Sequence, residues 1–89
     1  MRFEYDPNKS AANLDKHGID FEYAQALWDD ATVEFTANVK GEGRTKAIGR
    51  IGGEYWAANY TMRVEALRII SVRAATPEER SAYDRYANN

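Results

Sequence analysis

The stretch "RTKAIGRIGGEYWAANYTM", Arg44 to Met62, carries the clearest signal of secondary structure in the chain. On each side of the two glycines, a short run combines β-branched, aromatic and charged residues, a composition typical of strands. Glycine adopts a positive φ freely, so Gly52–Gly53 suits the two-residue turn of a β-hairpin. The stretch therefore predicts two antiparallel strands, over residues 44–51 and 54–62.

Further strands lie on both sides of this hairpin. Residues 32–37, "TVEFTA", alternate between apolar and polar types, and "NVKGEG" over 38–43 is typical of a turn. After a tight turn around Arg63–Glu65, residues 65–73, "EALRIISVR", form the next predicted strand. Four successive strands with short connections predict an antiparallel meander. "RFEY" at residues 2–5 predicts a short edge strand.

The remaining segments predict helices near residues 7–17, 20–29 and 76–87. Asp6 can cap free amides, and proline fits the first position of a helix. Gly18 can take the left-handed conformation that ends the first helix. The second helix has apolar residues at helical spacing, namely Phe21, Ala24, Leu27 and Trp28. "TPEE" at 76–79 is a capping box that opens the last helix.

These elements predict an α+β fold in a single domain over residues 1–89. The element order is β-α-α-β-β-β-β-α, and we expect one antiparallel sheet with the helices packed on one face. The chain is 44% hydrophobic and 29% charged, which indicates a globular protein.

Composition also excludes several classes of protein. The chain has no cysteine and one histidine, which argues against disulfides, zinc–sulfur sites and histidine-rich metal sites. We therefore expect neither a metal nor another cofactor. No apolar run is long enough to span a bilayer, and the N-terminus does not resemble a signal peptide, so we expect a cytoplasmic location without membrane contact.

Basic residues are concentrated in the middle of the chain. Residues 1–39 carry three basic and eight acidic side chains, whereas residues 40–73 carry seven basic and three acidic ones. This asymmetry fits a local anion-binding site. Basic side chains on exposed strands also keep a small sheet soluble, so charge alone leaves both interpretations open.

Two arginines on the last predicted strand are candidates for phosphate binding. Strict alternation places Arg68 and Arg73 on opposite faces of the sheet. An arginine among branched apolar residues suits bidentate phosphate binding, although a salt bridge to an acid of the chain explains it equally well. Three basic residues on or beside neighbouring strands add positive charge: Arg44, Lys46 and Arg63. Tyr60 either stacks on a base or belongs to the core.

Lys16 and His17 also have two interpretations. Both lie at the predicted C-terminus of the first helix, where the helix dipole favours cations. They are also able to move protons in RNA cleavage without a metal ion. In that reaction a base removes the proton of the 2′-hydroxyl, a cation stabilises the phosphorane, and an acid protonates the leaving oxygen.

Two segments resemble the BrnT family of ribonuclease toxins. The first, "FEYDPNKSAANLDKHGIDFEYA", carries the aromatic–x–aromatic–Asp pattern and the Lys16–His17–Gly18 trio. The second, "LRIISVRAATPEERSAYDRY", resembles the closing segment of the family through Arg68, Arg73 and the residues around them. "AIGR" (47–50) and "YTMR" (60–63) are also similar. Ala74 departs from the family pattern, which commonly has lysine after the arginine.

This resemblance implies a RelE-like fold and an endoribonuclease toxin of a type II toxin–antitoxin module. It implies that RNA cleavage inhibits translation and that a BrnA-type antitoxin neutralises the toxin. Operator DNA would be contacted only indirectly, through the antitoxin. As candidate catalytic residues we take His17, Lys16, Arg68 and Arg73, and as candidate RNA-binding residues Arg44, Lys46, Tyr60 and Arg63. The alternative is a non-catalytic interaction domain that binds the antitoxin and helps to regulate the operon.

Overall fold

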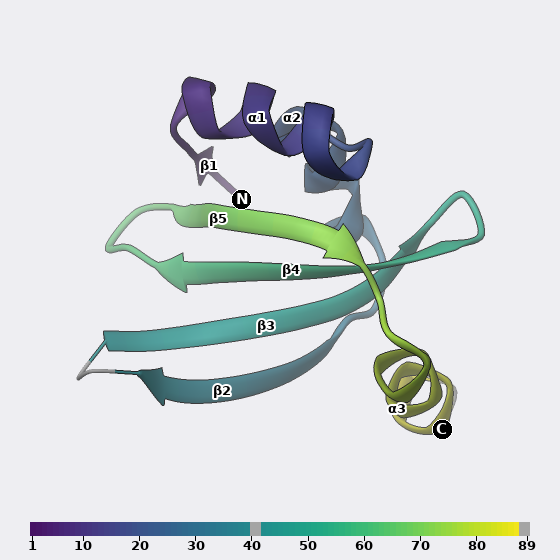
Figure 1. Cartoon of the computed structure of the whole chain (residues 1–89). Coiled ribbons are helices and arrows are strands. Elements are labelled where there is room, and N and C mark those ends of the chain that lie inside the picture. Colours follow the sequence, from purple (N-terminus) through teal and green to yellow (C-terminus); the bar gives the residue numbers. More distant parts are fainter. Residues whose placement is uncertain (40–41, 88–89) are drawn as a thin grey trace.

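The computed structural model describes residues 1–39 and 42–87. Within these ranges it shows one five-stranded sheet with helices on both faces (Figure 1). In chain order the elements are β1 (Phe3–Glu4), α1 (Pro7–His17), α2 (Phe21–Ala24), the 3-10 helix η1 (Gln25–Asp29), β2 (Val33–Val39), β3 (Glu42–Ile51), β4 (Glu54–Met62), β5 (Leu67–Ala74) and α3 (Pro77–Ala87). The predicted α+β class and element order are confirmed.

The sheet has the strand order β1-β5-β4-β3-β2, and β2 to β5 form the predicted antiparallel meander. The edge strand β1 instead runs parallel to β5, with Phe3 opposite Leu67. Gly52 and Gly53 have φ values of 59° and 92°, as the predicted hairpin turn requires. The turn expected at 38–43 is shorter than predicted, because residues 38–39 and 42–43 still pair as parts of β2 and β3, and residues 40–41 lie outside the described residues.

The second predicted helix is split. Only Phe21–Ala24 is α-helical, and Gln25–Asp29 continues as a 3-10 helix. Phe21, Ala24 and Leu27 are spaced by three residues, and all three are buried. A repeat of three matches the three residues per turn of a 3-10 helix, so the tighter helix keeps these side chains on the sheet.

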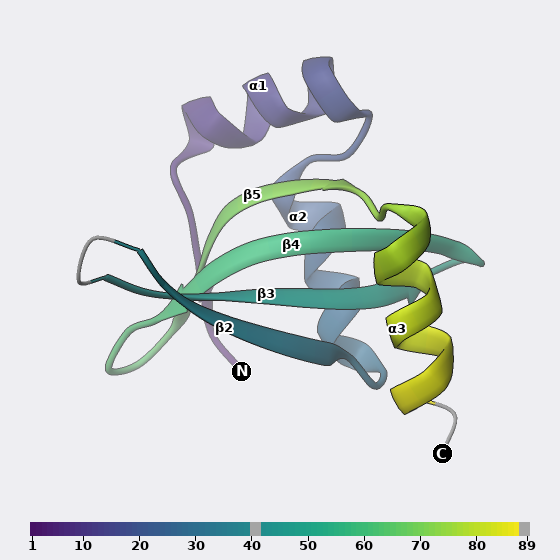
Figure 2. The same ribbon diagram turned by 60° about the horizontal axis from the view of Figure 1, so that its bottom comes forward.

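The placement of α3 differs from the expectation that all helices pack on one face. α1, α2 and η1 cover one face of the sheet, which we call the α1 face, and α3 covers part of the other, the α3 face (Figure 2). The reason is that β3 and β4 carry apolar residues on both faces. Ala47 and Ala58 belong to the α1-face core, whereas Ile48 and Ala57 pack with Tyr83 of α3.

A β-bulge in β5 changes which side chains share a face. Asn59 pairs with Ser71 and Tyr60 pairs with Ile69, so Ile70 is an extra residue without a partner in β4. The bulge lets Leu67, Ile69 and Val72 all be buried on the α1 face. Its consequence is that Arg68 and Arg73 both lie on the α3 face, and the prediction that they lie on opposite faces is wrong.

Asn13 fastens α1 to the sheet. Its Nδ2 donates to the carbonyl oxygens of Ile19 at 2.8 Å and Val72 at 2.9 Å, and its Oδ1 accepts from the N–H of Val72 at 3.2 Å. The Ser10 hydroxyl oxygen accepts from the N–H of Phe21 at 2.9 Å. Among the described residues, no helix has the length and hydrophobicity needed to cross a membrane.

Candidate functional site

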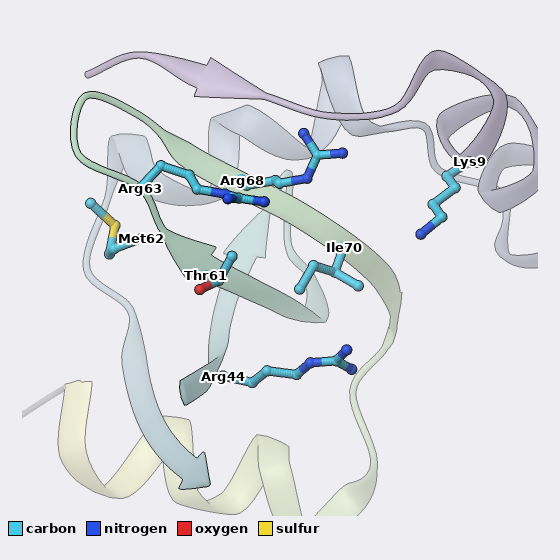
Figure 3. Close-up of a pocket in the computed structure, with 7 residues that line it drawn as sticks. All are labelled: Lys9, Arg44, Thr61, Met62, Arg63, Arg68 and Ile70. Atoms are coloured by element: carbon cyan, nitrogen blue, oxygen red, sulfur yellow. The ribbon is translucent and has the colours of Figure 1, made fainter. Parts of the chain in front are cut away.

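Four basic side chains surround one cavity beside the turn between β4 and β5. The cavity has a volume of about 430 Å³, and we call it the basic pocket. Figure 3 shows side chains converging on it from α1, β3, β4, β5 and the β4–β5 turn. The residues that line it are Lys9, Arg44, Thr61, Met62, Arg63, Arg68 and Ile70. The pocket therefore presents many hydrogen-bond donors to an anion.

The pairing of β4 with β5 positions two sides of this pocket. Thr61 lies opposite Arg68 in the antiparallel register, so both side chains lie on the α3 face. Arg63 follows β4, and its N–H donates to the carbonyl oxygen of Ala66 at 2.8 Å, which closes the turn. The structure thus places three of the sequence-predicted site residues, Arg44, Arg63 and Arg68, at one cavity.

One carboxylate lies beside these arginines. Glu4 Oε1 is 3.5 Å from Arg63 Nε and 3.7 Å from Arg68 Nη1. The Arg68 side chain is 34% exposed and is the more enclosed of the two arginines. Both distances are longer than a well-formed hydrogen bond, and loose, exposed ion pairs contribute little stability. A phosphate that enters the pocket can therefore compete for these guanidinium groups at small cost.

Arg73 belongs to a second cluster further along the α3 face. Its Nη1 and Nη2 donate to the two carboxylate oxygens of Glu79 at 2.7 and 2.9 Å, and Lys46 Nζ is 2.6 Å from Glu79 Oε2. Glu79 also accepts from the N–H of Thr76, and Thr76 Oγ1 accepts from the N–H of Glu79, which confirms the predicted capping box. Of the two interpretations of Arg73, phosphate binding and a salt bridge within the chain, the structure shows the salt bridge.

This Glu79 cluster shifts two pKa values. Hydrogen bonds from Arg73, and then from Lys46, hold the pKa of the Glu79 carboxyl well below its usual range, although burial opposes the shift. The same carboxylate raises the pKa of Arg73. Glu79 is only 7% exposed. Its ion pairs connect the start of α3 to β3 through Lys46 and to β5 through Arg73.

Replacing Glu79 by alanine should lower the free energy of unfolding by about 2 kcal/mol. Breaking a buried ion pair typically costs more, but the Arg73 and Lys46 side chains are about one-third exposed, so solvent reduces the loss. Urea denaturation measures the change, and Glu78→Ala in the same helical turn is the matched control. Equal stability of the Glu79 and Glu78 variants would refute the importance of the cluster.

The stability difference between wild type and Glu79→Ala should also depend on pH. Because the folded-state pKa of Glu79 is depressed, the unfolded chain binds this proton more readily than the folded protein. The stabilisation is complete above about pH 5 and decreases as the pH falls below the usual carboxyl pKa. The stability difference between wild type and Glu79→Ala should therefore shrink on acidification.

Tyr60 lies on the other face of the sheet. Its side chain is 4% exposed, and its ring contacts Trp28 edge-on at a centroid distance of 5.5 Å. Burial, and then a hydrogen bond to Glu34, raises the pKa of the Tyr60 phenol well above its usual value. The ring offers no exposed face to an RNA base, so its position agrees with the core interpretation.

Lys16 and His17 lie at the far end of α1 from the basic pocket. Both are exposed in the last turn, which Gly18 ends with a φ of 78° and an N–H donated to Leu14 at 2.9 Å. Lys9, which does line the pocket, lies eight residues before His17, or about 12 Å away along the helix axis. The structure therefore does not bring Lys16 and His17 together with the arginines.

If the protein cleaves RNA, as the resemblance implies, replacing His17 by alanine should leave the cleavage rate within about twofold of wild type. Loss of the exposed His17 side chain from the helix C-terminus should lower the free energy of unfolding by less than about 1 kcal/mol. Cleavage assays and thermal melting of the same preparation test both statements. A large loss of cleavage by a variant with unchanged melting would instead assign His17 to the reaction.

Lys9 was not among the sequence-predicted site residues. It lies one helical turn before the buried Asn13, so i,i+4 spacing places both on one side of α1. That spacing was the available signal, because a long basic side chain beside a buried position reaches the rim of the sheet. The described part of the chain has no group of three or more His, Cys, Asp and Glu that could hold a metal ion.

Comparison with known families adds a separate finding. Residues 5–79 match the family described as "Ribonuclease toxin, BrnT, of type II toxin-antitoxin system". The match covers most of the chain and includes all the residues that line the basic pocket. No individual curated protein matches the chain.

Proposed function

The chain belongs to the BrnT family, the ribonuclease toxins of type II toxin–antitoxin systems, and from this membership we propose that the basic pocket is where it binds and cleaves RNA. Family membership makes the protein an endoribonuclease with a cognate antitoxin. The observation that carries the proposal is the convergence of Lys9, Arg44, Arg63 and Arg68 on one cavity, in a protein whose net charge is −2. Phosphate contacts of this kind dominate the affinity of proteins for nucleic acids.

The proposed reaction is transesterification at the phosphate. The 2′-hydroxyl attacks the adjacent phosphorus, and negative charge develops on the non-bridging oxygens. Guanidinium groups held in place before the reaction stabilise this charge, and they do so more strongly where solvent is partly excluded. Arg68, the more enclosed of Arg63 and Arg68, is the main candidate for this role, with Arg63 supporting it from the turn.

We propose that the reaction needs no metal ion. The charge that a divalent cation would neutralise is neutralised instead by four basic side chains, and a cation would be repelled by them. Cleavage of messenger RNA in the cytoplasm would then inhibit translation. A BrnA-type antitoxin would neutralise the toxin by covering the pocket with acidic residues, and it would also supply the contacts to operator DNA.

Purified toxin incubated with a 5′-labelled RNA in excess EDTA tests this function. We expect cleavage products with 2′,3′-cyclic phosphate and 5′-hydroxyl ends, and we expect the co-purified antitoxin to suppress them. DNA of the same sequence should remain intact, because it lacks the nucleophile. Cleavage that disappears in EDTA would reject the metal-independent reaction. No cleavage under any condition would favour the interaction-domain alternative.

A further inference from the structure

We propose that Glu4 is the general base that removes the proton from the 2′-hydroxyl of RNA. This inference rests on the function proposed above, which needs a proton acceptor as well as cations. The residues that line the basic pocket supply donors, one hydroxyl and apolar groups, but no carboxylate or imidazole. The acceptor must therefore come from the edge of the pocket.

Glu4 is placed at that edge by the parallel pairing of β1 with β5. The register puts Glu4 directly opposite Arg68, and its Oε1 lies 3.7 Å from Arg68 Nη1 and 3.5 Å from Arg63 Nε. Glu4 and Arg63 also line an adjacent hollow of about 370 Å³, so Arg63 belongs to both cavities. A strand of RNA that passes from one cavity to the other comes within reach of the Glu4 carboxylate.

The contacts of Glu4 leave it free to accept a proton. Its side chain is 41% exposed, and its ion pairs both involve Oε1 at distances longer than a hydrogen bond. Substrate phosphate that binds the two arginines would compete with these contacts and release the carboxylate. The arginines thus neutralise the phosphate on one side while Glu4 accepts the proton on the other.

Other carboxylates fit this role less well. Glu79 is buried and accepts hydrogen bonds from Arg73, Lys46 and the N–H of Thr76. Glu34 lies on the α1 face, where it bonds to the buried Tyr60. Among the acids of the described chain, Glu4 alone forms ion pairs with two arginines of the basic pocket.

The reaction needs only RNA and water. The 2′-oxygen gives its proton to Glu4 and forms a bond to phosphorus, and the bond between phosphorus and the 5′-oxygen breaks. The 5′-oxygen takes a proton from water, and Glu4 later returns its proton to solvent. The products are a 2′,3′-cyclic phosphate and a 5′-hydroxyl.

The test compares wild type with Glu4→Gln, which keeps the size of the side chain and removes the base. We expect cleavage to fall at least 100-fold, while affinity for an RNA with a 2′-deoxy sugar at the cleavage site stays equal or increases. The acidic limb of the pH–rate profile should disappear in this variant. Glu4→Asp, which keeps a carboxylate, should retain the limb at a reduced rate.

Glu78→Gln is the matched control, because Glu78 is an exposed carboxylate in the first turn of α3 and lines neither cavity. It should cleave RNA at the wild-type rate. Glu4→Gln with wild-type cleavage, or with cleavage and affinity lost together, would overturn the assignment of the base while leaving the proposed function standing. If wild type itself does not cleave RNA, both the function and the assignment are rejected.

Discussion

Replacing Arg68 by alanine should slow RNA cleavage by about 100-fold, which corresponds to a loss of about 3 kcal/mol of transition-state stabilisation. Arg68 contributes a guanidinium group to the wall of the basic pocket and is only one-third exposed, so its charge acts where water is partly excluded. The loss should appear in kcat more than in KM, because charge on the phosphate increases in the transition state.

The fold should survive this substitution. Arg68 makes one loose ion pair, to Glu4 at 3.7 Å, and such exposed pairs contribute little stability. Arg80→Ala is a suitable control, since Arg80 is also an arginine on the α3 side but stacks on the Tyr55 ring at 4.8 Å, away from the pocket. Equal rates for the two variants, at equal melting temperatures, would remove Arg68 from the site.

Replacing Asn13 by alanine should lower the free energy of unfolding by about 3 kcal/mol. The side chain is 7% exposed and makes three hydrogen bonds to backbone groups of Ile19 and Val72. The substitution leaves these buried groups without partners, and each unsatisfied group costs about 1–3 kcal/mol, partly recovered if water enters. Denaturant titration measures the loss.

Two comparisons make this prediction specific. Asn8→Ala removes an exposed asparagine from the first turn of the same helix and should change stability by less than about 0.5 kcal/mol. Asn13→Asp removes the two donated bonds and should resemble the alanine variant. An Asn13→Ala protein as stable as Asn8→Ala would show that Asn13 does not fasten α1 to β5.

Local signals predicted most of the fold correctly. Several signals involve only neighbours in the chain and can be recognised in short segments. They are Pro7 at the start of α1, Gly18 at its end, the Gly52–Gly53 turn and the capping box at Thr76. The bulge at Ile70 was not predictable in this way. It results from the need to bury Leu67, Ile69 and Val72 on one face, which depends on the packing of α1 and α2.

The candidate site was predicted in part for the same reason. Arg44, Arg63 and Arg68 lie on or beside adjacent antiparallel strands, which the hairpin pattern had already placed side by side. Glu4 reaches Arg68 only through the parallel pairing of β1 with β5, across more than sixty residues of sequence. Lys16 and His17 were selected by motif, and spacing within one helix could not show which end of α1 faces the pocket.

A titration of isotope-labelled toxin with a short RNA, made non-cleavable by a 2′-deoxy sugar at the scissile position, shows where RNA binds. If RNA binds in the basic pocket, the amide resonances of Thr61, Arg63, Arg68 and Ile70 should shift most, and those of His17 and Gly18 should stay in place. Shifts centred on His17 and Gly18, with the pocket resonances unchanged, would show that RNA does not bind in the basic pocket.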